Sequence, residues 1–331
     1  MTMPKRKLGA NGPEVGALGF GAMSFAGFFG PADDEVSLQT LAAAEAAGID
    51  FWDTANIYGM GRSEAIIGRY FKEVGAKQKI TLATKASIIP GPPRSINNEA
   101  GYIRGELEAS LKRLNRDHVE LYYIHRREQD RPIEEVAETM GKLIEEGLIG
   151  GWGLSEVAPT TIRRAHAVTP VRAVQSEYSL WSREPELGVL QTCEALGIAF
   201  IPFSPVGRGI ISSVDLTPNT FEAHDFRRVN PRFMEPNFSA NMQHVKAFRA
   251  FAASKGVSVT ALAIAWSMKS SDMVIPIPGT RSKEHLQDWL PAATLKLTGE
   301  DLAEIERIMP VGWAHGPRYG DAQVLGVERF C

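Results

Sequence analysis

The 331-residue sequence has little of several features that would assign it to a specialised class of protein. It has only two cysteines, Cys193 and Cys331, which provide neither a disulfide framework nor a metal-binding spacing, and this suits a reducing compartment. Its formal net charge is -3, so it lacks the basic excess that a phosphate backbone demands. These absences argue against a secreted disulfide-rich protein, a metal-binding protein and a nucleic-acid-binding protein.

Long apolar runs and low-complexity breaks are also missing. The longest apolar stretch, VSVTALAIAW, is far shorter than a bilayer span, and the charged start MTMPKRK is not followed by the apolar region of a leader peptide. No linker rich in proline or serine interrupts the chain. We therefore predict a soluble cytoplasmic protein with no membrane partner, in which residues 1–331 form a single domain.

Short apolar runs that alternate with helix-type segments dominate the sequence. After a predicted hairpin around Ala10, Asn11 and Gly12, eight runs have the composition of buried strands. They cover residues 15–20, 48–53, 79–85, 119–125, 150–155, 172–178, 198–204 and 272–279. Continuous apolar strands followed by helices indicate a parallel sheet covered on its outer face. Eight such units predict an α/β fold, the (β/α)₈ or TIM barrel.

The competing α/β architecture is the doubly wound dinucleotide-binding fold, whose fingerprint is Gly-x-Gly-x-x-Gly between a strand and a helix. Here Gly19-Phe20-Gly21 is followed by Ser24 in place of the third glycine, and the same position after Gly59-Met60-Gly61 is Glu64. The absence of the fingerprint favours the barrel.

Residues with complementary chemistry follow the predicted strands, whose carboxyl ends converge on one rim of a barrel. The second strand ends in Asp53, the third in Lys85 and the fourth in His125, and Tyr58 lies just beyond Asp53. Any one of them has an ordinary structural explanation, but four together suggest carbonyl reduction, in which the carbonyl oxygen must receive a proton. The Tyr58 hydroxyl is the predicted donor, the Lys85 ammonium lowers its pKa, Asp53 holds the lysine, and neutral His125 orients the substrate oxygen.

At these residues the chain resembles the aldo-keto reductase family along essentially its whole length, and in particular the bacterial and plant branch related to potassium-channel β subunits. The motifs that carry the resemblance are DTANIYGMGRSEAIIG, ATK, YYIHR, GWGLS, VQSEYSLW, PFSPVGRG and IPGTRSKEHL. The resemblance implies a barrel with the catalytic residues Asp53, Tyr58, Lys85 and His125. It also implies an NADPH cofactor that lies extended across the barrel mouth and gives its pro-R hydride to a small carbonyl substrate.

Three segments are predicted to bind this cofactor. The resemblance assigns the nicotinamide carboxamide to Ser155 and Gln175 and the stacking face to Phe203; Glu156, where relatives often have Asn, would accept from the amide nitrogen. The rim loop Ser204, Pro205, Val206, Gly207 and Arg208 is predicted to lie under the pyrophosphate. Gly279 and Thr280 lead into a helix start, where Arg281 and Lys283 would meet the adenosine 2′-phosphate. Trp289 stands where relatives usually have an Asn near the adenine.

The predicted substrate wall is mostly apolar. It comprises Met23, Phe25, Phe29, Arg126 and Trp181, with the tail 310–331 beside them. Residues 207–237 are too many for an ordinary connection and are predicted to form a cofactor-covering loop after the seventh strand. We expect an aromatic or apolar aldehyde or ketone as substrate, and a sugar or polyol oxidised in reverse is the alternative.

Two other functional classes compete with a reductase. Channel β subunits are regulatory partners that resemble this chain in fold and cofactor, so a cofactor-binding regulatory or redox-sensing module is one alternative. A metal-dependent barrel hydrolase is the other, but His125 and Glu128 form a loose pair that no second histidine motif joins. The sequence does not distinguish a monomer from a homo-oligomer.

Overall fold

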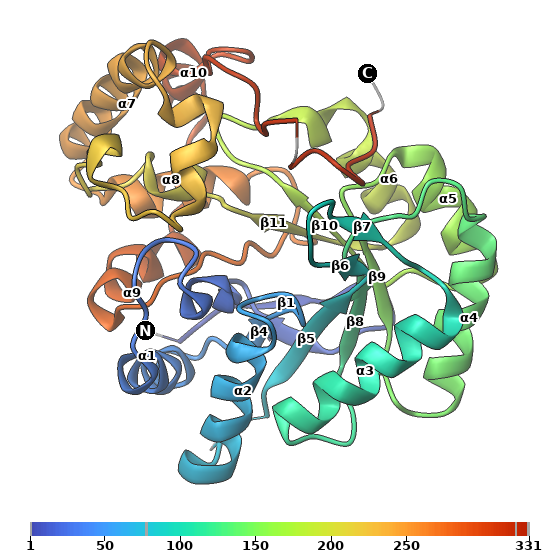
Figure 1. Ribbon diagram of the computed structural model, residues 1–331. Coiled ribbons are helices and arrows are strands. Elements are labelled where there is room, and N and C mark those ends of the chain that lie inside the picture. The colour runs from blue at the N-terminus through green and yellow to red at the C-terminus, as the bar shows by residue number, and fades with distance from the viewer. Residues whose placement is uncertain (1, 77–78, 322, 330–331) are drawn as a thin grey trace.

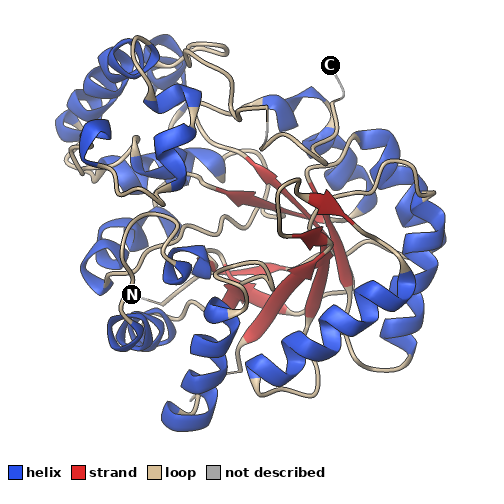
Figure 2. Ribbon diagram, in the orientation of Figure 1, coloured by secondary structure: helices blue, strands red, loops and turns tan. Residues whose placement is uncertain are grey.

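The computed structural model describes residues 2–76, 79–321 and 323–329, and its centre is a parallel sheet curled into a nearly closed barrel (Figures 1 and 2). The sheet has seven strands in the order β11-β10-β9-β8-β5-β4-β3. Their bounds are β3 (Phe20–Gly21), β4 (Phe51–Asp53), β5 (Thr81–Ala86), β8 (Leu121–Ile124), β9 (Trp152–Ser155), β10 (Ala173–Glu177) and β11 (Ala199–Phe203). Each corresponds to a predicted strand, and the predicted barrel is confirmed.

The eighth predicted strand, 272–279, differs from expectation in its hydrogen bonding. Only Val274 forms a bridge, to Phe200. Residues 275 and 277 donate their backbone N–H groups to β11, and the carbonyls of Pro276 and Pro278 accept from Gly19 and Gly21 at 2.9 Å each. Pro276 and Pro278 have no N–H group to donate toward β3, and Pro202 of β11 has none to donate toward this segment, so the segment closes the barrel without being a regular strand.

Helices surround the barrel, and several begin or end where the sequence predicts. Their bounds are α1 (Asp34–Ala46), α2 (Arg62–Arg69), α3 (Ala100–Leu114), α4 (Ile133–Glu145), α5 (Pro159–Val168), α6 (Val189–Leu196), α7 (Asn237–Ser254), α8 (Val259–Ser267), α9 (Lys283–Trp289) and α10 (Gly299–Ile308). The Asp33 side chain caps α1 by accepting from the amide of Val36. Gly48 and Gly147, just beyond α1 and α4, adopt left-handed φ angles of 81° and 76°.

The predicted N-terminal hairpin is present and closes one end of the barrel. It consists of β1 (Lys5–Lys7) and β2 (Glu14–Gly16), paired antiparallel. Leu8 and Val15 are fully buried in the same cluster as Phe51, Leu121 and other residues of the barrel interior. Ala10 donates its backbone N–H to Gly197, just before β11 begins. The hairpin therefore lies at the amino ends of the strands, and the carboxyl ends remain for the site.

A second, short hairpin lies beside the carboxyl ends of the strands. It consists of β6 (Ile88–Ile89) and β7 (Ser95–Ile96), and it directly follows β5 (Figure 1).

Among the described residues no single helix is long and apolar enough to cross a membrane. The helices α7 and α8 together have the length and composition of a membrane span, but they are bent by 99° relative to each other.

Candidate active site

A cavity of about 750 Å³ opens at the carboxyl ends of the barrel strands. Its floor and sides include residues at or just beyond strand ends, such as Gly21, Asp53, Ser155, Gln175 and Phe203. The structure therefore brings together, in one cavity, residues that lie far apart in the sequence, from Gly21 to Gln323. This is the rim on which barrel enzymes place their reacting groups.

Four side chains that the sequence singles out meet at the inner end of this cavity, and we call Asp53, Tyr58, Lys85 and His125 the rim cluster. Three of them line the cavity, whereas Lys85 is fully buried and does not. Asp53 is the last residue of β4, Lys85 lies in β5, His125 follows β8, and Tyr58 lies in the turn after β4. The Lys85 Nζ forms an ion pair with Asp53 and donates to the Thr54 carbonyl at 2.8 Å. It also lies 5.1 Å from the centre of the Tyr58 ring.

His125 completes the rim cluster beside Tyr58. The two rings meet edge to face with their centres 5.8 Å apart. The His125 backbone N–H donates to the Ala86 carbonyl, which fixes the residue at the rim. Its Nδ1 atom is buried and has no hydrogen-bond partner, although buried polar atoms are usually paired. The rim cluster therefore keeps one buried imidazole nitrogen without a partner, in a ring that packs against a phenol.

The electrostatics of the rim cluster agree with the sequence prediction for His125 and correct it for Tyr58. Burial, followed by the positive charges of Arg126 and Lys85, holds the pKa of His125 well below its ordinary value, so this ring is neutral. We expected Lys85 to give Tyr58 a lowered pKa. Burial is the larger influence, and although Lys85 opposes it, the pKa of Tyr58 is raised.

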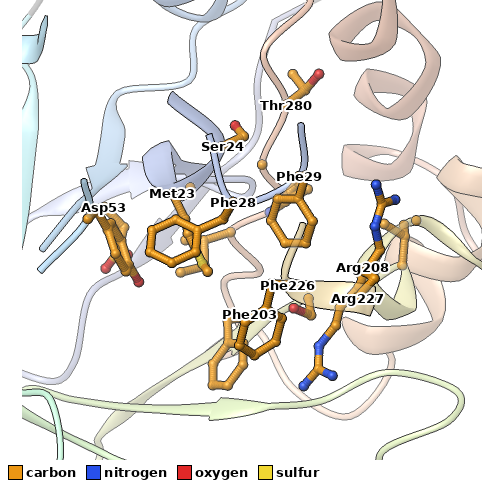
Figure 3. A pocket seen from close by; sticks show the side chains of 18 of the residues that line it. Met23, Ser24, Phe28, Phe29, Asp53, Phe203, Arg208, Phe226, Arg227 and Thr280 are labelled. Atoms are coloured by element: carbon orange, nitrogen blue, oxygen red, sulfur yellow. The ribbon is translucent and has the colours of Figure 1, made fainter. Parts of the chain in front are cut away.

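The structure places three of the four residues predicted to bind the nicotinamide at the cavity, and one outside it. Ser155, Gln175 and Phe203 line the cavity next to the rim cluster. The Gln175 Nε2 donates to Asp53 at 2.9 Å, and this contact ties the predicted carboxamide site to the rim cluster. Figure 3 shows the Phe203 ring facing the cavity, with Asp53 and the aromatic residues Phe28 and Phe226 around the same space.

Glu156 does not line this cavity, which corrects the predicted amide contact. Its left-handed φ of 57° turns the side chain away, and one carboxylate oxygen accepts from the Glu177 backbone N–H. The other accepts from Arg318 at 2.6 Å. Arg318 comes from the C-terminal tail, more than 150 positions later in the chain, so no local signal at Glu156 reveals this partner.

Arg208 lines the cavity but is not the free cation that the sequence suggests. Its guanidinium donates to Glu177 at 2.9 Å and to the Arg318 carbonyl at 3.1 Å. We call Glu156, Glu177, Arg208 and Arg318 the tail cluster, because its salt bridges join the C-terminal tail to the barrel. Among the other predicted pyrophosphate residues, Ser204, Pro205 and Val206 line the cavity, whereas Gly207 does not.

Left-handed backbone is concentrated at the rim. Apart from Asn115, which ends α3, every described non-glycine residue with positive φ lies in a turn that follows a strand of the barrel: Met60, Ser87, Glu156, Ser204 and Arg208. Such conformations cost on the order of 1–3 kcal/mol each and persist only where the surrounding structure imposes them. The rim turns are therefore held in conformations that the sequence does not favour locally.

The outer end of the cavity is lined by the segment before α9. Gly279, Thr280 and Arg281 line it, whereas Lys283 is exposed and does not. The Arg281 Nη1 donates to the Pro31 carbonyl at 2.8 Å. Gly30 has a φ of 103°, and a Cβ atom there would lie 3.0 Å from the Arg281 Nη1. Among the described residues Arg281 has no carboxylate partner.

The predicted loop over the cavity is confirmed, and it meets the loop after β3. Residues such as Ser212, Val214, Leu216 and Phe226 line the cavity from this side. The Phe226 backbone N–H donates to the Phe28 carbonyl at 2.9 Å. The two loops thus join above the space between the rim cluster and Arg281, near Arg227 and Phe29 in Figure 3.

The predicted substrate wall is partly correct. Met23, Phe29 and Arg126 line the cavity. Phe25 does not, because it is fully buried with its ring centre 5.5 Å from that of Phe20 in the core. Trp181 does not either, since its ring packs against Phe233 behind the rim.

The tail 310–331, predicted to lie beside the substrate wall with Trp313, does supply wall residues. Tyr319 and Gln323 line the cavity, whereas Trp313 is buried and donates to the Leu180 carbonyl. Residues 322, 330 and 331 of the predicted tail lie outside the described part of the chain. Arg94, in the β6–β7 hairpin, also lines the cavity, and the sequence analysis missed it. Its position in the connection after the third predicted strand was a signal, because every such connection reaches the same rim.

No group of three His, Cys, Asp or Glu side chains within the described ranges is placed to hold a metal ion. Glu128, which the sequence offered as a partner for His125, instead accepts from the Asn98 backbone N–H and from Arg131.

The chain is similar to known proteins over nearly its whole length. A sequence model of the Aldo/keto reductase family matches residues 17–310. An aldo-keto reductase from Schizosaccharomyces pombe, whose name carries NADP(+), is 38% identical over 325 residues, covering 96% of this chain and 95% of the relative. A probable aldo-keto reductase from Glycine max is 37% identical over 316 residues, covering 95% and 91%.

Solved structures have the same fold. A glycerol dehydrogenase from Gluconobacter oxydans superposes with a TM-score of 0.83 at 26% identity, covering 93% of this chain and 95% of the other. An aldo/keto reductase from Klebsiella pneumoniae, solved with NADP and acetate, has a TM-score of 0.73 at 24% identity, covering 96% and 99%.

Proposed function

Because the chain belongs to the aldo-keto reductase family, we propose that it is an NADPH-dependent reductase that converts an aldehyde or ketone into an alcohol. The observation that carries the proposal is the rim cluster at the inner end of the cavity, where a proton donor and a neutral imidazole line one space and a buried cation lies against the proton donor. Those three groups are what a carbonyl oxygen needs when it gains negative charge.

The residues at the two ends of the cavity suit an extended dinucleotide, with the nicotinamide at the inner end and the adenosine 2′-phosphate at the outer end. Phe203 offers an aromatic face and Ser155 and Gln175 offer amide partners at the inner end, while Arg281 is a cation without a carboxylate partner among the described residues at the outer end. The buried Ser24 Oγ, on the cavity wall between them, has no hydrogen-bond partner. When bound, NADPH would supply the hydride for the carbonyl carbon.

Tyr58 is the proposed proton donor. Burial raises its pKa and so keeps the hydroxyl protonated at neutral pH. Lys85 is the nearest cation and stabilises the phenolate that remains after the proton has moved to the substrate oxygen. Burial opposes the charge on Lys85, but Asp53 and Tyr58 outweigh it and raise its pKa, so the ammonium persists through this step.

His125 and Asp53 are proposed to position the reacting groups. A neutral His125 donates a hydrogen bond to the substrate oxygen and holds it against the Tyr58 hydroxyl. Asp53 holds the Lys85 ammonium and also accepts from Gln175, so the same carboxylate aligns the lysine with the proposed carboxamide site.

Oxidation of a polyol is the second candidate reaction. It is favoured by the similarity to a glycerol dehydrogenase at 26% identity. The wall beside the rim cluster, with Met23, Phe28, Met60 and Ile88, is apolar and suits a less polar compound. We therefore place carbonyl reduction first and the reverse reaction on a sugar or polyol second.

The cellular setting is also a proposal. Cys193 is buried and free, and burial raises its pKa to about 12, so this thiol is unreactive and is compatible with a reducing cytoplasm.

Replacement of Tyr58 by Phe tests the proposal. We expect kcat for aldehyde reduction to fall by roughly 10²-fold or more, because the general acid is lost while the cofactor residues remain. NADPH consumption with a panel of aldehydes, ketones, quinones and sugars measures the rate, and NADPH binding is followed by protein fluorescence as the control. A kcat close to that of the unmodified enzyme would reject this role, and no turnover of any compound by the unmodified enzyme would reject the reductase itself.

A further inference from the structure

Two arginines face the inner end of the cavity, beside the rim cluster. Arg126 follows His125 directly, and Arg94 lies between β6 and β7 in the hairpin that follows β5. Both line the same cavity as Tyr58 and His125. They come from different connections of the barrel, so the fold and not the local sequence places them together.

Arg126 is held rigidly and is still incompletely bonded. Its Nη1 donates to the His125 carbonyl at 2.6 Å and to the Ser155 Oγ at 3.1 Å. The residue is 7% exposed, and its Nε is buried without a hydrogen-bond partner. The Arg94 Nε is likewise buried and unpartnered.

No carboxylate neutralises this pair within the described part of the chain. The acidic side chains nearby are already bonded to other cations: Asp53 to Lys85, and Glu156 to Arg318. Arg126 is a buried cation without a counterion, which is costly, and the half-buried Arg94 adds the repulsion of a second cation. In agreement, burial and then the charge of Arg126 lower the pKa of Arg94. Two neighbouring arginines without a carboxylate are unfavourable by themselves. They therefore point to a ligand whose anionic group neutralises them.

From this geometry we propose that the substrate is a carbonyl compound with an anionic group, a carboxylate or a phosphate, which Arg94 and Arg126 bind. The inference rests on the proposed reductase function and names its substrate class. A guanidinium presents paired N–H donors that match both oxyanions. The apolar wall nearby, with Phe28, Met60 and Ile88, suits an apolar body between the carbonyl and the anion.

Matched pairs of aldehydes test the proposal. One pair is 4-carboxybenzaldehyde and 4-formylbenzamide, which have nearly the same shape and differ in charge. The other is glyceraldehyde 3-phosphate and glyceraldehyde, which tests phosphate in place of carboxylate. We expect the anionic member of at least one pair to have a kcat/KM higher by roughly 10-fold or more, mainly through a lower KM. The pair that shows the preference identifies the anion.

Variants of Arg94 assign the preference to this site. Arg94→Gln should reduce the preference for the anionic aldehyde by roughly 10-fold through KM. Arg94→Lys should keep part of this preference, because lysine retains the charge but lacks the paired N–H donors of a guanidinium. Arg104→Gln, which removes an exposed arginine paired with Glu146, is the control and should keep the full preference. Equal kcat/KM within both pairs, or an unchanged preference in Arg94→Gln, overturns the proposal.

A binding measurement decides the anion site independently of turnover. Titration of 4-(hydroxymethyl)benzoate and 4-(hydroxymethyl)benzamide into the NADP(+)-saturated protein, followed by tryptophan fluorescence, should show tighter binding of the benzoate. Tighter binding that is lost in Arg94→Gln supports the site even if no aldehyde is reduced, in which case only the reductase function fails. Equal binding of the two compounds overturns the site.

Discussion

The rim cluster and the tail cluster are both groups of buried charges at the same end of the barrel, but they differ in what surrounds them. The side chains of Asp53 and Lys85 are 2% and 0% exposed, and those of Glu177 and Arg208 are 0% and 3% exposed. In the tail cluster each carboxylate forms an ion pair with at least one arginine, although Arg208 also lines the cavity. The rim cluster lines the same cavity and keeps an unpartnered imidazole nitrogen.

Burial of charge alone therefore does not identify a reacting group in this protein. Arg208 was a plausible phosphate ligand by its place in the rim loop, yet Glu177 and the Arg318 carbonyl occupy its donors. Arg281, Arg94 and Arg126 have no carboxylate partner among the described residues and line the same cavity. Among the arginines of this cavity, incomplete bonding of the charge, and not its burial, separates those proposed to bind a ligand from Arg208.

The largest effect is expected for Lys85→Met in the rim cluster. The variant removes the cation that most opposes the burial of Tyr58, so the pKa of the phenol rises further and its phenolate is no longer stabilised. We expect kcat at neutral pH to fall by roughly 10²- to 10⁴-fold. A pH–rate profile measures it. Lys269→Met, which removes a lysine that packs on Trp266 outside the cavity, is the control; an equal loss in both variants would contradict the assignment.

Arg318→Met in the tail cluster should lower the free energy of unfolding much more than it lowers kcat. It leaves the buried carboxylate of Glu156 without its cation, and removal of one partner of a buried pair typically costs about 3 kcal/mol or more. Urea unfolding measures the loss, and Arg307→Met, whose side chain is 72% exposed, should change the free energy of unfolding by no more than about 0.5 kcal/mol. We expect kcat to fall far less than in Lys85→Met. The comparison fails if activity is lost to a similar degree while stability is retained.

Arg281→Ala tests the unpaired cation at the outer end of the cavity. The adenosine 2′-phosphate of NADPH would make a charge-assisted contact with this guanidinium, whereas NADH has only a hydroxyl there. We expect NADPH binding to weaken by about 1–3 kcal/mol and NADH binding to change little. Fluorescence titration of both cofactors measures this. Equal weakening of the two, or a preference of the unmodified protein for NADH, would show that Arg281 does not bind the phosphate.

The smallest effect concerns His125 and the pH dependence of folding. Burial and the neighbouring arginines and Lys85 hold its pKa well below the ordinary 6.5, so below this pH the unfolded chain binds a proton here that the folded chain does not. Stability should therefore fall as the pH falls, by at most about 1.4 kcal/mol per pH unit from this residue. Urea unfolding of His125→Asn at pH 7.5 and 5.5 should show a shallower decline than the unmodified protein. Identical slopes would mean that His125 is protonated in the folded protein.

Much of the fold could be predicted because it depends on local patterns. Seven of the predicted strands, the hairpin and the long loop after β11 agree with the structure. The position of the eighth segment was predicted but its hydrogen bonding was not, because Pro276 and Pro278 have no N–H group to donate toward β3. Phe25 and Trp181 were misplaced because an aromatic side chain suits a pocket wall and a core equally well, and only packing decides between them.

The sequence by itself determined the composition of the rim cluster. Strands that alternate with helices form a parallel barrel, and a parallel barrel brings the carboxyl ends of its strands to one rim, so Asp53, Lys85 and His125 had to meet there. Only the tertiary structure decided which arginines remain without a partner. That outcome depends on where the C-terminal tail packs against the barrel. The Arg318 side chain donates to Glu156, and the Arg318 backbone carbonyl accepts from Arg208. Contacts between segments so far apart in the chain leave no periodic pattern in the sequence, since they form only when the whole barrel has closed.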